Sequence, residues 1–362
     1  MTKPVFAILG AAMLCACTTR AGLAPPPGYY APIGDVVTAQ TGRASCPTAA
    51  PSPHTGALVF RSKYDGSDSA RADINPAATE EYREQTRAIV ELERGVVQHV
   101  MRLVRDGRPR DLDCVVQWLD AWARADALMS TDFNHTGKSM RKWSLGSLAS
   151  AWLNLKFSVS QPLAAYPLEA RRIESWFARL AGQTVEDWSG LPLERVNNHS
   201  YWAAWAVMAS AVALDRRDLF DWSVERFRVA ASQVDKRGFL PNELRRKQRA
   251  LAYHNYSLPP LTMIAAFARV NGADLRGDHD AALRRLAERV IAGIDDHEAF
   301  VRETGKKQET DDIQDYADFA WLEPYCALYA CTAKVEDWKR GMQPFRVTRL
   351  GGDVTRIFRA TP

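Results

Sequence analysis

Apolar residues recur every three or four positions along most of this 362-residue chain. This spacing places apolar side chains on one face of an α-helix. In the segment 87–107 they stand at Ile89, Leu92, Val96, Val100 and Val104. The spacing predicts an amphipathic helix here that ends near Gly107, because glycine commonly terminates a helix.

Seven further segments carry the same helical period, and no strand-like alternation interrupts them. They are 111–129, 138–157, 168–188, 200–215, 217–234, 242–270 and 279–294. Long helices joined by short linkers pack as antiparallel hairpins, and no repeat of fixed length suggests a uniform helical array. Several helices also carry polar and aromatic residues on faces that would otherwise be apolar. We therefore expect an all-α fold, a toroid of helical hairpins around a central cleft.

The segment 242–270 is expected to form one helix with a polar face. Arg246 and Tyr253 are seven residues apart, so they would share that face, about 10 Å apart along the axis. An anion over the face would meet both side chains. Pro259 and Pro260 follow, and we expect the helix to kink or stop there because proline lacks a backbone N–H.

Residues 1–21 have the pattern of an export signal, with Lys3 ahead of the apolar run Val5–Leu14, which is too short to span a bilayer. Cleavage before Cys17 with lipidation of this residue, and cleavage to a soluble protein, both fit the pattern. Either places the chain in the periplasm. Residues 22–362 are expected to form a single catalytic domain, with a Pro- and Gly-rich extended arm (22–60) and a polar lid loop (about 61–79).

Four cysteines lie beyond this signal. An exported chain with an even number of cysteines favours disulfides. Cys326 and Cys331 are close enough in sequence to close a small loop, which leaves Cys46 to pair with Cys114. The competing hypothesis of a metal site has no C-x-x-C or His-rich spacing to support it.

The amino-acid composition excludes few classes of ligand. The 47 basic and 43 acidic residues give a formal charge of +4, which does not indicate a nucleic-acid-binding protein. Most of the 11 tryptophans are expected in the core. A few that face the cleft would offer flat surfaces on which a sugar ring can stack, and we expect Trp202 to bind substrate.

Three polar clusters are candidate binding sites. Asn197, Asn198 and His199 precede an apolar helix, where amides beside an imidazole can orient an anion or simply cap the helix. The other candidate ligand-binding residues lie at a helix entry or on the lid loop: Asn134, His135, Lys138 and Arg141, and Lys63 and Tyr64. For all of them a structural role or a solvated surface is the competing interpretation.

Six motifs, PPPGYYAP, RSKYDGSDSARA, DFNHTGKSMRKW, NNHSYWAAW, GFLPNELRRKQRALAYHNY and WLEPYCALY, occur in this order along the chain. Together they resemble the periplasmic alginate lyases of polysaccharide lyase family 5, over about residues 25–356. The resemblance implies an incomplete (α/α) toroid and β-elimination on poly-mannuronate without a metal or other cofactor. It assigns catalysis to Asn198, His199, Arg246 and Tyr253, with Lys63 as the lid lysine and Tyr256 as a further substrate contact.

The chemistry of this reaction explains the residue types. The C5 proton of a 4-linked uronate is weakly acidic because it lies α to the C6 carboxylate, whose charge must be neutralised; Asn198, Arg246 and His199 would do this. Tyr253 would take H5 and protonate O4 where both lie on one face, as in mannuronate, if cationic neighbours lower its pKa. In guluronate they lie on opposite faces, and His199 would be the base.

Two other functions compete with this interpretation. A glycoside hydrolase on the same toroid needs two carboxyl groups in the cleft, for which Glu243 and Asp132 are the best candidates. A non-catalytic alginate-binding part of an export assembly would bind the polymer without cleaving it. Under the lyase hypothesis, the role would be to clear alginate left in the periplasm during its export.

Overall fold

The computed structural model describes residues 22–33, 45–64, 73–313 and 316–359. The expected export signal, with Cys17, lies outside the described residues, and so does the middle of the expected lid loop, 65–72. The described chain is helical except for one short antiparallel hairpin of β1 (Arg346–Val347) and β2 (Gly352–Asp353). None of the described helices is both long enough and apolar enough to cross a membrane.

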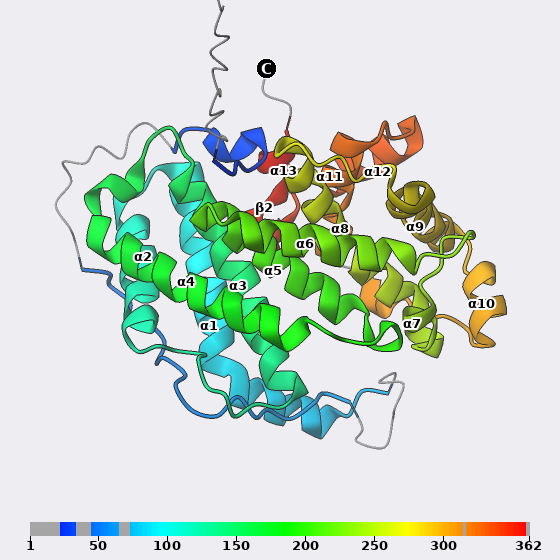
Figure 1. Cartoon of the computed structure of the whole chain (residues 1–362), viewed down its shortest axis with the longest axis horizontal. Helices are drawn as coiled ribbons and strands as arrows, with labels where there is room; N and C mark the ends of the chain where they lie inside the picture. Colours follow the sequence, from blue (N-terminus) through cyan, green and yellow to red (C-terminus); the bar gives the residue numbers. More distant parts are fainter. Residues whose placement is uncertain (1–21, 34–44, 65–72, 314–315, 360–362) are drawn as a thin grey trace, which may run out of the picture.

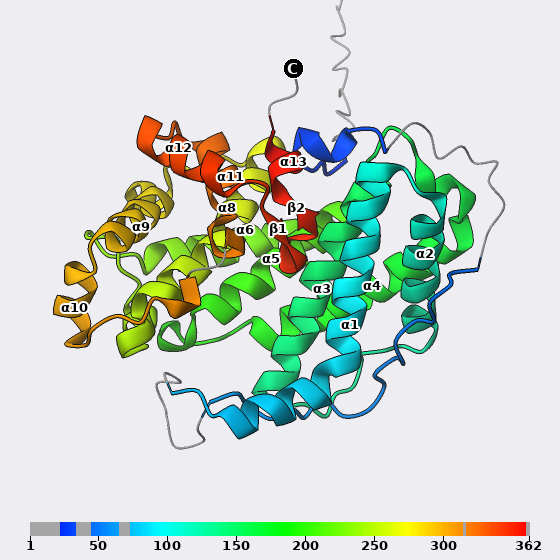
Figure 2. The ribbon, with the colours of Figure 1, turned by 180° about the vertical axis from the view of Figure 1, so that it is seen from behind.

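Eight helices form four hairpins of neighbours in sequence. They are α1 (Pro76–Asp106) with α2 (Pro109–Arg124), α3 (His135–Lys156) with α4 (Pro167–Trp188), α5 (Asn198–Leu214) with α6 (Arg217–Ser232), and α8 (Ala250–Val270) with α9 (Asp278–Asp295). The first members, α1, α3, α5 and α8, contact one another in turn, and the second members cover them from outside (Figures 1 and 2). The predicted all-α toroid of helical hairpins is therefore confirmed.

Five shorter helices complete the described fold. They are α7 (Pro241–Leu244), α10 (Glu298–Thr304), α11 (Leu322–Leu328), α12 (Ala333–Met342) and α13 (Val354–Phe358). The first of these precedes α8, and the last two bracket the β-hairpin near the C-terminus (Figure 2). Short 3₁₀ turns connect several elements, and two of them, η4 (Lys247–Arg249) and η7 (Thr348–Leu350), lie beside the candidate site.

Helix α5 lies at the centre of the molecule because it has no polar face. Nearly all of its side chains are buried, and it contacts α3, α4, α6 and α8. Small residues allow α3 to approach it closely: a Cβ on Gly146 would lie 3.5 Å from the Cβ of Ala206. A helix that is apolar all round must be enclosed by others. The first turns of α3 and α5 are consequently held side by side.

The helix does not stop at Pro259 and Pro260, because α8 continues through both prolines to Val270. A proline at position 260 cannot donate to the carbonyl of Tyr256, four residues earlier. The indole N–H of Trp202 donates to that carbonyl instead, at 3.2 Å. A tertiary partner thus satisfies the acceptor that the proline leaves open, and the helix tolerates it.

The start of α1 also differs from the prediction. The helix begins at Pro76, not near Arg87, and Asn75 caps it by accepting from the backbone N–H of Ala78 at 2.9 Å. Proline suits the first helical position, where no N–H is needed. Residues 76–79, expected in the lid loop, therefore belong to α1.

The N-terminal arm lies along the helical body, as predicted (Figure 1). Leu23 donates its backbone N–H to Asp215 at 2.7 Å, and the indole N–H groups of Trp118 and Trp122 donate to carbonyls of the arm. Disulfides join Cys46 to Cys114 and Cys326 to Cys331, which confirms both expected pairs. The first of them attaches the arm to α2.

The arm then passes over the start of α3 at very short range. The backbone of Leu58 forms a bridge to Phe133, and a Cβ on Gly137 would lie 1.6 Å from the Leu58 carbonyl oxygen. Only glycine can occupy that position. The arm thereby brings Lys63 and Tyr64 to the open end of the inner helices.

Candidate active site

A cavity of about 270 Å³ opens between the inner helices, the arm and the C-terminal segment. Among its lining residues are Lys63 and Tyr64 just after the arm, His135 of α3, Asn198 and His199 of α5, Arg246 and Arg249 before α8, Tyr253 and Tyr256 of α8, and Arg349 of η7. All four residues expected to be catalytic are therefore brought to one site. The packing of α5 against α8 brings Asn198 close to Tyr253, although the two residues are 55 positions apart in the sequence.

His199 stands in the first turn of α5, where Asn197 caps the helix by accepting from its backbone N–H at 3.0 Å. The imidazole is stacked on Trp188, with ring centroids 5.9 Å apart and planes 2° from parallel. Its Nδ1 lies 2.9 Å from Lys142 Nζ and 3.1 Å from Ser139 Oγ. The ring is thus held by α3 and α4 and lines the cavity.

Asn198 is fixed from behind by a buried carboxyl group. Both its backbone N–H and its side-chain amide donate to Glu243, at 2.7 and 3.0 Å. Arg246 Nε lies 3.7 Å from the other oxygen of Glu243, which has no exposed surface. Burial raises the pKa of Glu243, although Arg246 and Asn198 oppose this. Glu243 therefore orients two of the expected catalytic residues.

Arg246 and Tyr253 lie together, but not for the predicted reason. The expected single helix is broken: α7 ends at Leu244, η4 follows, and α8 begins at Ala250. Lys247 adopts a left-handed backbone conformation, with φ of 53°. The side chain of Gln308 bonds Lys247 O at 3.1 Å and Leu251 N at 3.0 Å, so it satisfies backbone groups at the break.

The result of this break is a close cation–π contact. The Arg246 guanidinium carbon lies 4.4 Å from the centroid of the Tyr253 ring, and that of Arg249 lies 5.5 Å from it. The Tyr253 hydroxyl is hydrogen-bonded to the hydroxyl of Tyr64, just after the arm. Two cations and a second phenol thus surround the Tyr253 side chain.

The condition that cationic neighbours bring the pKa of Tyr253 below its usual value is not met in this structure. Burial raises the pKa above the usual value for tyrosine, and the Tyr64 hydroxyl adds to the rise. Arg246 and Arg249 lower it, but by less than burial raises it. With Tyr64 in place, Tyr253 is a neutral phenol.

Three of the predicted substrate contacts do not line the described cavity. Asn134 caps α3 by accepting from Gly137 N at 2.9 Å, and it donates to Phe60 O. Arg141 is 1% exposed and forms an ion pair with Asp187 at 2.7 Å. Trp202 is 4% exposed and lies beneath Tyr256. These side chains stabilise the walls of the site, because each already has a structural partner.

The other predicted contacts do reach the site. Lys63, Tyr64 and Tyr256 line the first cavity, His135 lines both it and a second one, and Lys138 lines the second. The second cavity has a volume of about 460 Å³ and shares His135, His199 and Arg246 with the first. The two cavities thus meet at the expected catalytic residues.

Arg349 is the site residue that sequence reasoning missed entirely. Its guanidinium carbon lies 4.2 Å from the centroid of the Trp143 ring, and it donates to the Tyr256 hydroxyl. It arrives from the C-terminal segment, about 100 residues after Arg246 in the chain, with no local motif to mark it. Lys142 lies in one of the recognised motifs, but nothing local indicated that it would contact His199.

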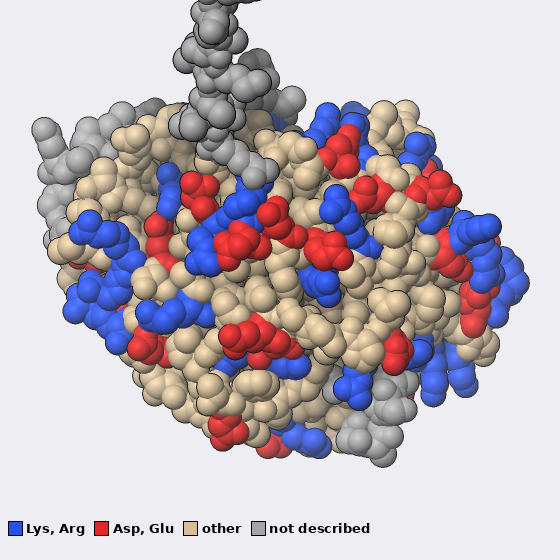
Figure 3. All heavy atoms as spheres, in the orientation of Figure 1, with Lys and Arg blue, Asp and Glu red and all other residues tan. Residues whose placement is uncertain are grey.

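The charge of the cavity differs from that of the surface. Basic and acidic side chains are interspersed over the face shown in Figure 3. The cavity, by contrast, is lined by the cations Lys63, Arg246, Arg249 and Arg349, and among its described lining residues the carboxylate is Asp318. A cation-lined cavity favours an anionic ligand.

The carboxyl pair required of a glycoside hydrolase is not formed. Glu243 has no exposed surface and is bonded to Asn198, whereas Asp132 lies on the exposed segment before α3. Neither residue lines the described cavity. The arrangement therefore does not support that alternative.

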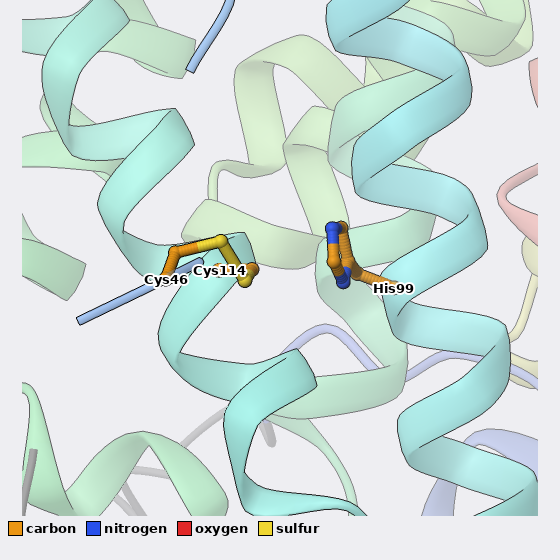
Figure 4. Close-up of side chains that lie close together, drawn as sticks. All are labelled: Cys46, His99 and Cys114. Atoms are coloured by element: carbon orange, nitrogen blue, oxygen red, sulfur yellow. A yellow bond between two sulfur atoms is a disulfide. The ribbon is translucent and has the colours of Figure 1, made fainter. Parts of the chain in front are cut away.

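Within the part of the chain that the structure describes, two clusters of His, Cys or acidic residues have the spacing of a metal site, Cys46–His99–Cys114 and Cys326–Cys331–Glu336. Figure 4 shows the first, with the two sulfur atoms bonded to each other and His99 to one side. A sulfur in a disulfide is no longer the thiolate that binds a metal. His99 instead bonds Asp111 at 2.6 Å. Both clusters are better explained by their disulfides.

Comparisons with known proteins identify relatives of this chain. Residues 59–300 match the family model described as "Alginate lyase". The chain is 58% identical to an alginate lyase of Pseudomonas aeruginosa, which covers 97% of this chain and 95% of that protein. It is also 58% identical to an alginate lyase of Azotobacter vinelandii, over 97% of this chain and 93% of the relative.

Solved structures show the same fold at lower identity. Alginate lyase A1-III of Sphingomonas species A1 superposes with a TM-score of 0.69 at 23% identity, covering 92% of this chain and 91% of that one. A variant of alginate lyase A1-III in complex with a tetrasaccharide superposes with a TM-score of 0.73 at 22% identity. That match covers 94% of this chain and 98% of the other.

Proposed function

This chain belongs to the alginate lyase family, and from that premise we propose that it cleaves mannuronate-rich alginate by β-elimination within the polymer. The products would be shorter chains whose new non-reducing ends carry a 4-deoxy unsaturated uronate. The observation that carries the proposal is the meeting of Asn198, His199, Arg246 and Tyr253 in one cation-lined cavity.

The first requirement of the reaction is a site for the C6 carboxylate. Removing H5 places negative charge on a group that is already anionic, so this charge must be offset by fixed donors and cations. Arg246 supplies a guanidinium, and Asn198 and His199 supply polar groups on the same wall of the cavity. Glu243, bonded to Asn198 and close to Arg246, keeps two of these groups in place.

The second requirement is proton transfer at C5 and O4. The electron pair of the C5–H bond moves towards the carboxyl group, the C4–O4 bond breaks, and O4 takes up a proton. Tyr253 would perform both transfers in mannuronate, where H5 and O4 lie on one face. In guluronate His199 would take H5 and Tyr253 would protonate O4.

Tyr64 has a part in this sequence of events. Its hydroxyl occupies the hydrogen-bonding position of Tyr253 and adds to the rise in the pKa of that phenol. Tyr253 can act as a base only as the phenolate, so the contact with Tyr64 opposes this role. We therefore place the separation of Tyr64 from Tyr253, on binding of the polymer, before the chemical step.

Cleavage within the polymer is supported by the two cavities. They share His135, His199 and Arg246, so a bound chain can continue past the catalytic residues in both directions. Lys63 borders the first cavity, and Lys138, Arg195 and Arg245 border the second. These cations are suited to successive uronate carboxylates on either side of the cleaved bond.

We place this activity in the periplasm, where it would remove alginate left there during its export. The same proposal includes contact with an export complex and a lipid anchor at Cys17. Two disulfides support an oxidising compartment. The export signal expected at residues 1–21 is the second support.

One assay tests the reaction and its specificity. The purified protein is mixed with poly-mannuronate or with poly-guluronate, and the near-ultraviolet absorbance of the unsaturated product is followed while product length is measured by size-exclusion chromatography. We expect a faster rise with poly-mannuronate, and an early fall in mean chain length. Binding without any rise in absorbance would instead establish the non-catalytic function, and a preference for poly-guluronate would refute the proposed specificity.

A further inference from the structure

We infer that Lys142 is a positioning residue for His199: with Ser139, it holds the imidazole proton on Nδ1, so that His199 takes up and releases its other proton at Nε2. The consequence for catalysis rests on the proposed function, whereas the position of the proton does not. Lys142 belongs to α3 and His199 to α5, and their side chains meet at 2.9 Å beneath the cavity.

Lys142 is an unusual lysine because it has no exposed surface. Its Nζ lies 3.9 Å from the centroid of the Trp188 ring and 4.9 Å from that of Trp143. Among the described residues no carboxylate lies within 4.0 Å of it. Asp187, the carboxylate that attracts a charge on Lys142, is already paired with Arg141 at 2.7 Å.

These surroundings favour an uncharged amine. Burying an ammonium without a carboxylate partner carries a large desolvation penalty, which cation–π contacts offset only in part. Charged neighbours on the surrounding elements add to the cost, since Arg349 and Lys138 repel a charge on Lys142 more than Asp187 attracts it. Burial together with these cations holds the pKa of Lys142 well below its usual value. Among the described residues, His135 is a further titratable group beside the imidazole, at 4.8 Å between ring centroids.

Ser139 decides the direction of the hydrogen bonds at Nδ1. A hydroxyl group has a single proton to donate. Ser139 donates this proton to the carbonyl oxygen of His135, at 2.8 Å. Its oxygen, 3.1 Å from His199 Nδ1, can therefore only accept there. Without a proton on Nδ1, its lone pair would face a lone pair of the Ser139 oxygen, which is unfavourable. With the proton on Nδ1, the N–H donates to that oxygen.

The amine of Lys142 completes this arrangement. A neutral amine has two N–H groups and one lone pair. The two N–H groups can be directed at the faces of Trp188 and Trp143, and N–H contacts with aromatic faces are weakly favourable. The lone pair then accepts from His199 Nδ1, beside the Ser139 oxygen. Every donor and acceptor in this group has a partner only when the proton resides on Nδ1.

The result is an imidazole whose second nitrogen, Nε2, is the one that titrates. When protonated there, His199 is a cation that can offset the charge of the substrate carboxylate. When it is deprotonated there, the lone pair at Nε2 can accept H5. Lys142 thus allows one histidine to serve both of the roles that the reaction can require.

Nitrogen-15 NMR of the histidine-labelled protein tests the proton position directly. Above the titration of His199, we expect the wild-type signal of a neutral imidazole with the proton on Nδ1, assigned by its loss in His199→Ala. Lys142→Met fills the same space without an acceptor, and we expect its signal to move towards the Nε2–H form. Lys142→Gln offers an acceptor oxygen and should restore the wild-type signal. A wild-type signal of the Nε2–H form would overturn the inference.

Activity measurements add the catalytic consequence. We expect kcat on poly-mannuronate to fall by about 10-fold to 100-fold in Lys142→Met, the range found when a group that orients a functional imidazole is removed. KM should change little, and Lys142→Gln should recover part of the loss. Equal activity of all three proteins would exclude the positioning role. If the wild type cleaved no alginate, the proposed function would fail, while the NMR result would still decide where the proton lies.

Discussion

The guanidinium of Arg246 lies over the ring of Tyr253 at 4.4 Å, although the two residues belong to different elements of the chain. A short 3₁₀ turn separates them and turns the arginine back across the start of α8. The contact joins the group that would neutralise the substrate carboxylate to the group that would transfer its proton. It also makes the two functions interdependent.

Replacing Arg246 by Gln is therefore expected to have two effects. The kcat on poly-mannuronate should fall by about 10²-fold to 10³-fold, because a donor to the developing charge is lost. The acid limb of the pH–rate profile should also move to higher pH, since Arg246 lowers the pKa of Tyr253. Arg228→Gln is the matched control, because it removes an equal charge from the surface ion pair with Asp278. It should leave both kcat and the acid limb of the pH–rate profile unchanged.

Replacing Tyr64 by Phe should move the acid limb of the pH–rate profile to lower pH. The Tyr64 hydroxyl raises the pKa of Tyr253, so its loss lowers that pKa and makes the phenolate available at lower pH. The measurement is kcat/KM over a range of pH for the wild type and the variant, because the contact between the two hydroxyls belongs to the free enzyme. An unchanged profile would show that the Tyr64–Tyr253 contact has no part in the titration.

Tyr253→Phe should abolish turnover while the polymer still binds. Removing a group that transfers protons costs about 10²-fold to 10⁴-fold in rate, whereas the ring and its contact with Arg246 remain. Turnover is followed by product absorbance, and binding by the change in tryptophan fluorescence on adding poly-mannuronate. Activity close to that of the wild type would refute the role of Tyr253.

His254 predicts how stability depends on pH. Burial lowers its pKa to about 4, and its ring bonds Leu240 N at 2.9 Å and Ala250 O at 2.7 Å. Between pH 6.5 and about 4 the unfolded chain binds a proton at this residue and the folded chain does not. Stability should therefore fall as pH falls through this window, by on the order of 3 kcal/mol from His254 alone.

Urea unfolding at several pH values measures this contribution. His254→Asn keeps a donor for Ala250 O and cannot titrate. It loses the ring that accepts from Leu240 N, so it should be less stable than the wild type at pH 7. The difference between the two proteins should narrow towards pH 4. A constant difference across the window would assign the pH dependence to other groups.

The two disulfides are expected to contribute unequally. The paired cysteines are 68 positions apart in the first disulfide and 5 positions apart in the second. Loop entropy predicts that replacing Cys46 and Cys114 by Ser costs about 4 kcal/mol, against about 2 kcal/mol for Cys326 and Cys331. Urea unfolding of both double variants tests this order. The reverse order would mean that the arm is held to α2 mainly by its other contacts.

Local pattern was sufficient for part of the fold and the site. The period of apolar residues indicated the main helices, and Asn197 with His199 indicated the start of α5. The proximity of Arg246 and Tyr253 was also predicted, but from a continuous helix that the structure does not contain. Gln308, distant in sequence, helps to stabilise the break, and no local pattern could indicate this.

The remaining features depend on burial and on contacts between distant segments. Arg349 reaches the cavity only because the C-terminal segment packs against α3. The raised pKa of Tyr253 follows from its enclosure and from Tyr64, neither of which is evident along the chain. Arg141 and Trp202 look like ligands in sequence because they stand in polar or aromatic motifs, yet their partners are other parts of the protein.

The contact between the two ends of the folded body bears on when the chain can finish folding. Residues 27–30 pack beside α13, and a Cβ on Gly28 would lie 2.1 Å from the carbonyl oxygen of Ile357 (Figure 1). This contact cannot form until residues 354–358 have left the ribosome, so the N-terminal segment cannot complete its docking while the chain is being made. Under the proposed periplasmic location, the segment that follows the export signal is therefore among the last to reach its final place.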